Sequence, residues 1–166
     1  MSNIPPAAIR HRLQEYCTRN RIAAIDLLGQ GKDGSVWQTD RDSAIKIHAT
    51  NESYQPEIVA YIRLLEKKLK FIAGFNVPEL LEFDDELFAI EMTIVFPPYL
   101  LDFASAIIDR KSDLIEDEGN TIADLVTERF GARAAEILYL QQQLVAQAGI
   151  YITDLHPHNI KFAVSQ

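Results

Sequence analysis

The chain has 166 residues, of which 24 are acidic and 16 basic, and its formal net charge is −8. Because affinity for nucleic-acid backbones rests largely on Lys and Arg, this balance argues against a nucleic-acid partner. A single cysteine, Cys17, excludes an intramolecular disulfide framework and is typical of a reducing compartment. No apolar run approaches the ~18 residues of a membrane span, so we expect a soluble, cytoplasmic protein with no membrane partner.

The N-terminal half predicts a short helix followed by a five-stranded antiparallel sheet. Ile9, Leu13 and Tyr16 recur at helical spacing after Pro5 and Pro6. β-Branched and apolar runs separated by polar turns predict strands over 23–28, 35–39, 43–48, 79–83 and 87–95. One long helix of about four turns is predicted after Pro56, between the third and fourth strands.

The C-terminal half predicts mainly helices. Pro97 and Pro98 end the last strand and indicate a hinge, which divides the chain into residues 1–96 and 97–166. The segments predicted there are a helix that contains Leu100, Leu101, Phe103 and Ala104, a surface loop over 110–119, helices that end near Gly131 and Gly149, and two strand-like runs flanking Pro157.

A glycine triplet lies between the first two predicted strands. Gly29, Gly31 and Gly34 have the spacing G-x-G-x-x-G, in which backbone N–H groups can approach an anion closely. The same spacing occurs in dinucleotide-binding turns, but there the glycines open a helix. Because apolar strands are predicted on both sides of this loop, we favour a flap that covers a nucleotide, with Lys46 on the next strand.

The order of these features resembles the protein-kinase-like superfamily from about Ile22 to Phe162. The final motif, Asp154-Leu155-His156-Pro157-His158-Asn159, resembles the D-L-H-P-x-N form of aminoglycoside-phosphotransferase-like and related bacterial kinases. The resemblance implies an α+β fold with an N-lobe sheet and one long helix, followed by a small, truncated, mainly helical C-lobe. It also implies a nucleotide partner, with ATP and Mg²⁺ as cofactors.

The resemblance assigns roles to individual residues. Gly29, Gly31, Gly34 and Val36 would cover the nucleotide, and Lys46 would contact the α and β phosphates. Glu57 would hold Lys46, although a carboxylate in the first turn of a helix is also favoured by the helix dipole alone. The stretch from Glu91 through Thr93 to Val95 would bind the adenine ring. Asp154 would orient or deprotonate an acceptor hydroxyl, His156 would orient Asp154, and Asn159 would coordinate Mg²⁺.

Two departures from the family pattern limit what the motif implies. The His-Arg pair that precedes the aspartate in many protein kinases is replaced by Ile152-Thr153. The D-F-G segment, whose aspartate binds the main Mg²⁺, is expected after Asn159, and the sequence ends at Gln166 before it. Asp154 could bind the metal in its place, but no other group would then serve as the base.

A different metal site is an alternative for the same motif. Asp154, His156 and His158 alternate as Asp-x-His-x-His, and such ligands suit a transition metal if the segment is extended. Pro157 favours a turn, in which the three side chains would diverge. Asp154 and Asn159 could also cap that turn.

Three functions are compatible with these features. The first is a minimal kinase that binds ATP and Mg²⁺ and transfers phosphate to an acceptor hydroxyl, alone or with another subunit. The second is a pseudokinase that acts as a protein-interaction module, with a homo-oligomer or partner protein covering the shortened C-lobe. The third, a nucleic-acid accessory protein, is disfavoured by the acidic charge.

Overall fold

The computed structural model of the chain describes residues 5–109 and 121–163. The surface loop predicted over 110–119 lies outside the described residues. The helices are α1 (Ala7–Asn20), α2 (Asn51–Glu66), α3 (Ile122–Phe130) and α4 (Ala134–Ala148), and a 3-10 turn over Gly131–Arg133 joins the last two. Among the described helices, none is long and apolar enough to cross a membrane.

A five-stranded antiparallel sheet forms the N-terminal half, with the strand order β1-β2-β3-β7-β6. Its strands are β1 (Ala24–Gly31), β2 (Gly34–Thr39), β3 (Ser43–His48), β6 (Leu80–Asp84) and β7 (Ala89–Thr93). These bounds agree with the five predicted strands to within a few residues. The predicted α+β class, with a five-stranded antiparallel sheet, is therefore confirmed.

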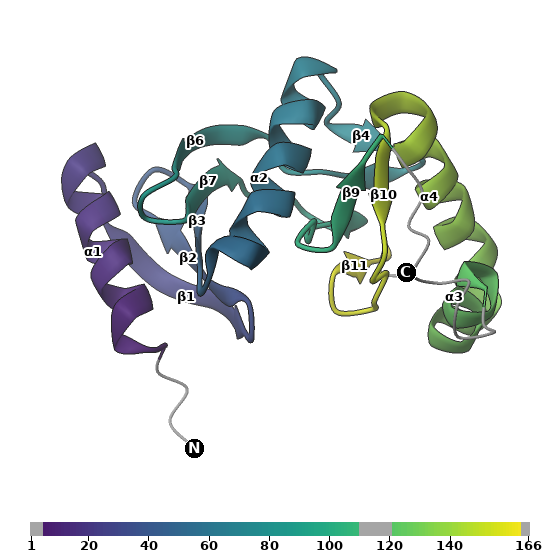
Figure 1. Cartoon of the computed structure of the whole chain (residues 1–166), viewed down its shortest axis with the longest axis horizontal. Coiled ribbons are helices and arrows are strands. Elements are labelled where there is room, and N and C mark those ends of the chain that lie inside the picture. The colour runs from purple at the N-terminus through teal and green to yellow at the C-terminus, as the bar shows by residue number, and fades with distance from the viewer. Residues whose placement is uncertain (1–4, 110–120, 164–166) are drawn as a thin grey trace.

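Helices α1 and α2 cover opposite faces of this sheet (Figure 1). Side chains alternate between the faces of a strand, so β3 divides its residues between the two helices. Ile45 and Ile47 are buried with Ile9 and Leu13 of α1. Lys46, between them, must point to the other face, where α2 lies. The alternation in Ser43–His48 thus places one lysine beneath a helix.

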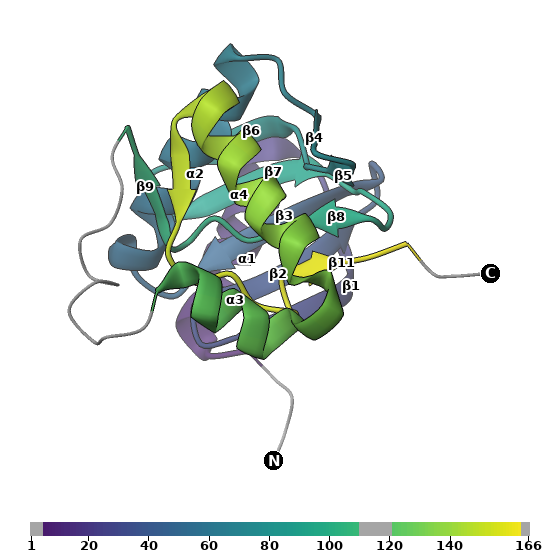
Figure 2. The same ribbon diagram turned by 90° about the vertical axis from the view of Figure 1, so that its right-hand side faces the viewer.

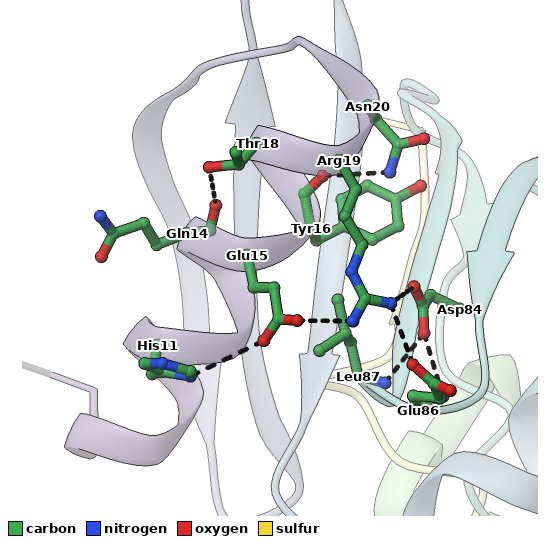
Figure 3. Close-up of polar contacts among 10 residues, drawn as sticks. All are labelled: His11, Gln14, Glu15, Tyr16, Thr18, Arg19, Asn20, Asp84, Glu86 and Leu87. Atoms are coloured by element: carbon green, nitrogen blue, oxygen red, sulfur yellow. Dashed lines mark hydrogen bonds and ion pairs between the residues drawn. The ribbon is translucent and has the colours of Figure 1, made fainter.

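Helix α1 is fixed to the sheet by polar contacts as well as by its apolar face. Figure 3 shows Arg19 between Glu15 of its own helix and the turn after β6, where it bonds Asp84 at 2.9 Å and Glu86 at 3.1 Å. The buried Tyr16 hydroxyl donates to Oε2 of Glu91 at 3.0 Å. Helix α1 is therefore anchored on the face of the sheet opposite Lys46.

Helix α2 begins earlier than predicted. Thr50 caps it, its side-chain oxygen accepting from the N–H of Ser53 at 3.4 Å, and Pro56 lies inside the helix. Glu57 is consequently the seventh residue of α2. The helix-dipole explanation for this carboxylate does not apply, because that effect is confined to the first turn.

The helix predicted over Leu100 to Ala104 is replaced by two short strands, β8 (Tyr99–Leu100) and β9 (Ala106–Ile108). Strand β8 lies in a second sheet of order β11-β8-β5-β4, and β9 pairs with β10. The other strands of these sheets are β4 (Phe71–Ile72), β5 (Phe75–Asn76), β10 (Ile150–Ile152) and β11 (Ile160–Lys161). Pairing with distant strands overrides the local apolar pattern, and the β4–β5 hairpin was not predicted.

Helices α3 and α4 pack against each other beside these small sheets (Figure 2), with α4 contacting β10. The larger buried cluster joins both halves of the chain: it contains Tyr61 and Ile90 from the first and Phe103, Ile137 and Leu140 from the second. This shared core holds the two small sheets against α2.

Candidate nucleotide site

A buried ion pair joins the predicted strand lysine and helix glutamate. Nζ of Lys46 lies 2.5 Å from Oε2 of Glu57, whose side chain is fully buried. Burial raises the pKa of Glu57 to about 7, although Lys46 opposes that rise. For Lys46, burial alone would lower the pKa, but Glu57 and Asp102 outweigh burial and raise it. The pair that the sequence predicted is thus formed.

A third buried side chain, which was not predicted, lies beside this pair. Nε2 of His48 lies 3.3 Å from Oε2 of Glu57, and Nδ1 lies 3.3 Å from Oγ of Ser53. Burial, with a smaller effect of Lys46, lowers the pKa of His48 to about 3. A neutral imidazole adds no second positive charge beside the lysine, and its buried Nε2 makes no hydrogen bond within the described residues despite lying near the carboxylate.

Asp102 is the second carboxylate near Lys46, and the sequence pattern predicted no role for it. Its Oδ1 lies 3.5 Å from Nζ of Lys46 and accepts a hydrogen bond from the N–H of Ala104 at 2.8 Å. The side chain is 26% exposed, so it faces a solvent-accessible space rather than the core. A carboxylate therefore stands between the buried lysine and solvent.

Two short strand pairs bring Asp102 beside the C-terminal motif. Strand β8 pairs antiparallel with β11, and β9 pairs antiparallel with β10. Two loops lie between these pairs: 101–105 joins β8 to β9, and 153–159 joins β10 to β11. The N–H of Leu101 donates to the carbonyl of Asn159 at 3.0 Å, and the N–H of Asp154 donates to Oγ of Ser105 at 3.1 Å. The loops consequently lie side by side.

The segment 102–104, Asp-Phe-Ala, resembles the D-F-G segment of protein kinases with alanine in place of glycine. Phe103 is fully buried, and its ring lies edge-on to that of Tyr61 in α2, with centroids 5.3 Å apart. The Tyr61 hydroxyl also donates to the carbonyl of Leu101 at 3.2 Å. An aspartate-phenylalanine pair therefore packs beneath α2, but it precedes Asp154 in the chain instead of following it.

A cavity of about 270 Å³ opens between the glycine loop, the start of α2 and these two loops. Its lining residues are Lys32, Asp33, Thr50, Glu52, Ser53, Asp102, Ala104, Ser105, Asp154 and Asn159. Four carboxylates face this space against one lysine. A polyphosphate would enter it favourably only with a cation, and the oxygen donors present suit a hard divalent ion.

The glycine loop reaches the cavity through its tip, Lys32 and Asp33. The carbonyl of Asp33 accepts from the N–H of Ala49 at 2.9 Å, which ties the tip to the segment before α2. Gly34 has a φ of +154°, and a Cβ there would lie 2.2 Å from the carbonyl oxygen of Ile47. Glycine at position 34 is therefore required for close contact with β3. Contact of Gly29, Gly31 and Gly34 with phosphates stays a prediction.

Part of the predicted adenine-binding stretch lies inside the sheet, because Glu91 is in the middle of β7. The backbone of Glu91 pairs with Ile45 on one side and Glu82 on the other. Its side chain is held by Tyr16 and by Ser43, on the face opposite Lys46. This environment argues against Glu91 as a nucleotide contact, because its backbone groups are already paired.

Thr93 and Val36 have environments different from that of Glu91. Thr93 ends β7, where its N–H donates to the carbonyl of Glu79 at 3.0 Å and its Oγ1 accepts from the Glu79 N–H at 2.9 Å. Val36 is partly buried against the larger core and pairs with Lys46 across β2 and β3. Their contacts with a nucleotide stay predictions.

Asp154 is 55% exposed at the cavity, and Oδ1 accepts from Nη1 of Arg129 at 2.6 Å. His156 instead accepts on Nδ1 from the N–H of His158 at 3.2 Å, and the two rings are edge-to-face with centroids 4.4 Å apart. The structure thus gives Asp154 partners other than His156, whose catalytic role stays a prediction. Asn159 lines the cavity, and its role as a metal ligand stays a prediction too.

The transition-metal alternative gains no support from the structure. Within residues 5–109 and 121–163, no three His, Cys, Asp or Glu side chains are grouped to hold a metal ion. Mg²⁺ needs fewer protein ligands, because it is bound by one or two carboxylates together with phosphate oxygens and waters. Asp102, Asp154 and the amide of Asn159 fit that requirement.

Comparison with known proteins adds little to this geometry. No protein-family model matches the chain, and no curated protein sequence matches it. Among solved structures, the complex of APH(2'')-IIa with streptomycin and ATP is 16% identical, with a TM-score of 0.41 over 58% of this chain and 30% of that one. The complex of APH(2'')-IIa with gentamicin is 13% identical, with a TM-score of 0.39 over 88% of this chain and 41% of that one.

Both structures are of an aminoglycoside phosphotransferase. This chain spans less than half the length of either. The chemistry of the site must therefore be inferred from its own residues.

Proposed function

We propose that the chain binds ATP with Mg²⁺ in the cavity between the glycine loop and the loops 101–105 and 153–159, and transfers the γ-phosphoryl group to an acceptor hydroxyl. The observation that carries this proposal is the meeting of Asp102, Asp154 and Asn159 at one cavity. Asp102 lies 3.5 Å from the buried Lys46, on its solvent side. This arrangement matches the order that phosphoryl transfer needs, with the lysine behind the metal ligands.

With the C-terminal motif alone, Asp154 would have to serve as both metal ligand and base, and Asp102 removes this conflict. With Asp102 and Asn159 as the metal ligands, Asp154 is free to act as the base. Mg²⁺, when bound, would neutralise charge on the β and γ phosphates. Lys46 would contact the α and β phosphates, held in place by Glu57.

The proposed transfer step moves one phosphoryl group and one proton. The acceptor oxygen attacks the γ-phosphorus while its proton passes to the carboxylate of Asp154. The bond from the γ-phosphorus to the bridging oxygen breaks, and ADP leaves with that electron pair. Catalysis of phosphoryl transfer depends mostly on positioning and charge stabilisation, and the loops 101–105 and 153–159 would supply both.

The pseudokinase alternative depended partly on the lack of a second metal-binding carboxylate, a role that Asp102 would fill, and partly on apolar surface expected at a shortened C-lobe. The two functions differ in a direct experiment. Isothermal titration with ATP should give a binding isotherm when Mg²⁺ is present, and ADP should form slowly on incubation, with water taking the place of the acceptor hydroxyl. Absence of heat at millimolar nucleotide would refute both nucleotide binding and transfer. Binding without any ADP would favour the pseudokinase.

A further inference from the structure

Arg129, in the last turn of α3, bonds the loop 153–159 through a single nitrogen. Its Nη1 donates to Oδ1 of Asp154 at 2.6 Å and to the carbonyl of Leu155 at 2.7 Å. We infer that Arg129 is a positioning residue, which fixes the carboxylate of Asp154 so that its second oxygen meets the acceptor hydroxyl. This inference rests on the proposed transfer reaction for its functional meaning.

The bonds around Asp154 leave one of its oxygens open. Its N–H is fixed to Ser105, and Oδ1 is taken by Arg129. Among the described residues, Oδ2 has no hydrogen-bond partner. A carboxylate held by one oxygen and open at the other is suited to receive a proton from a bound hydroxyl. The arginine would therefore set the direction in which Asp154 can act.

A purely structural role for Arg129 is a competing explanation. A cation in the last turn of a helix is favoured by the helix dipole, whatever it contacts. Here, however, the guanidinium reaches out of α3 to a loop 25 residues further along the chain. Its side chain is 33% exposed and that of Asp154 is 55% exposed, and ion pairs this exposed contribute little to folding stability.

Helix α3, which carries Arg129, is capped at its start and packed against the core. A capping box between Thr121 and Asp124 starts the helix, and Val126 is buried in the larger core. Arg129 lies one turn after Val126 and points to the cavity side. Arg133, four residues later, contacts Glu136 and the ring of Phe162, and offers a matched control.

The first test compares ADP formation from Mg-ATP by wild type, Arg129→Met, Arg129→Lys and Arg133→Met. A misplacement of about 1 Å costs roughly 100-fold in rate, so Arg129→Met should lower kcat by about that factor with the KM for ATP unchanged. Arg129→Lys should recover part of the loss, because one nitrogen makes both bonds. Arg133→Met should behave as wild type. An unchanged kcat in Arg129→Met would overturn the inference.

The second test asks whether Arg129 acts through Asp154. In an Asp154→Asn background, Arg129→Met should cause no further loss of kcat, because the group that it positions is already inactive. If the two losses multiply instead, Arg129 acts independently of Asp154 and the inference fails.

A third measurement needs no nucleotide and separates this inference from the proposed function. Amide hydrogen exchange of residues 154–156, 158 and 159 should be several-fold faster in Arg129→Met than in wild type or Arg133→Met, since the loop loses two bonds. Equal exchange would overturn the positioning role. If wild type fails to bind Mg-ATP, only the proposed function is refuted, and exchange still decides the role of Arg129.

Discussion

Asp102→Asn should weaken binding of Mg-ATP by at least about 100-fold and leave the fold unchanged. Outer-shell changes at metal sites already cost 10–100-fold in metal affinity, and a ligand should cost more. The fold should be preserved because the asparagine Oδ1 can still accept from the N–H of Ala104, as Asp102 does at 2.8 Å. Calorimetric titration with Mg-ATP, and a thermal melt of the free protein, measure the two effects.

Without the metal, Asp102→Asn should have the opposite effect on the affinity for ATP. Asp102 is one of four carboxylates at the cavity, so its removal reduces repulsion of free ATP. Titration with ATP and a chelator should therefore show binding that is equal to or stronger than that of wild type. Asp26→Asn is the control, because Asp26 is exposed on β1 and its substitution removes the same charge. Equal Mg-ATP affinity in Asp102→Asn and Asp26→Asn would contradict the assignment of Asp102 as a metal ligand.

Asp154→Asn should separate binding from chemistry. General-base catalysis typically contributes 10²–10⁴-fold, so we expect ADP formation to fall by about that range. Mg-ATP affinity should stay within a few-fold of wild type, since Asp102 and Asn159 would still hold the metal. The carboxamide has nearly the shape of the carboxylate and can still accept on Oδ1 from Arg129.

The pattern across the two variants is what identifies the roles. Loss of binding in Asp102→Asn with loss of turnover alone in Asp154→Asn assigns the metal to the first and the proton to the second. If Asp154→Asn loses Mg-ATP binding as severely as Asp102→Asn, Asp154 is itself a metal ligand. Unchanged ADP formation in Asp154→Asn would remove it from the mechanism.

The sheet half of the fold could be predicted because its information is local. Alternation along Ser43–His48 separates Ile45 and Ile47, which pack on α1, from Lys46, which faces α2. The lysine–glutamate pair was predicted from the resemblance, and the alternation explains why Lys46 faces the helix that carries Glu57. The start of α2 was misplaced because Pro56 was taken as a boundary, whereas Thr50 supplies the cap.

The second half of the site could not be predicted in the same way. The run around Leu100 reads as helical locally, and its strand pairs lie some 60 residues further along the chain, at Ile160 and Lys161. A second carboxylate for Mg²⁺ was expected after Asn159, where the resemblance places the D-F-G segment. The one sequence signal was the Asp-Phe-Ala triplet at 102–104, and it is informative only when order along the chain is ignored.

Side chains that join separate elements were also beyond the reach of the sequence pattern. Glu91 was assigned to the adenine site from the resemblance, which does not show that its carboxylate accepts from Tyr16 on the face opposite Lys46. Arg129 carried no motif, and its contact with Asp154 depends on how α3 packs beside the loop. In both cases the contact joins elements that are far apart in the sequence.

We propose that the loops 101–105 and 153–159 hold one metal–nucleotide site between them. Mn²⁺ binds the same oxygen ligands as Mg²⁺ and broadens the NMR signals of nearby amides. When Mn²⁺ and ATP are added to the isotopically labelled protein, the amide signals of both loops should broaden together at the same low metal concentration. Broadening of the 153–159 loop without the 101–105 loop, or of neither, would contradict the account.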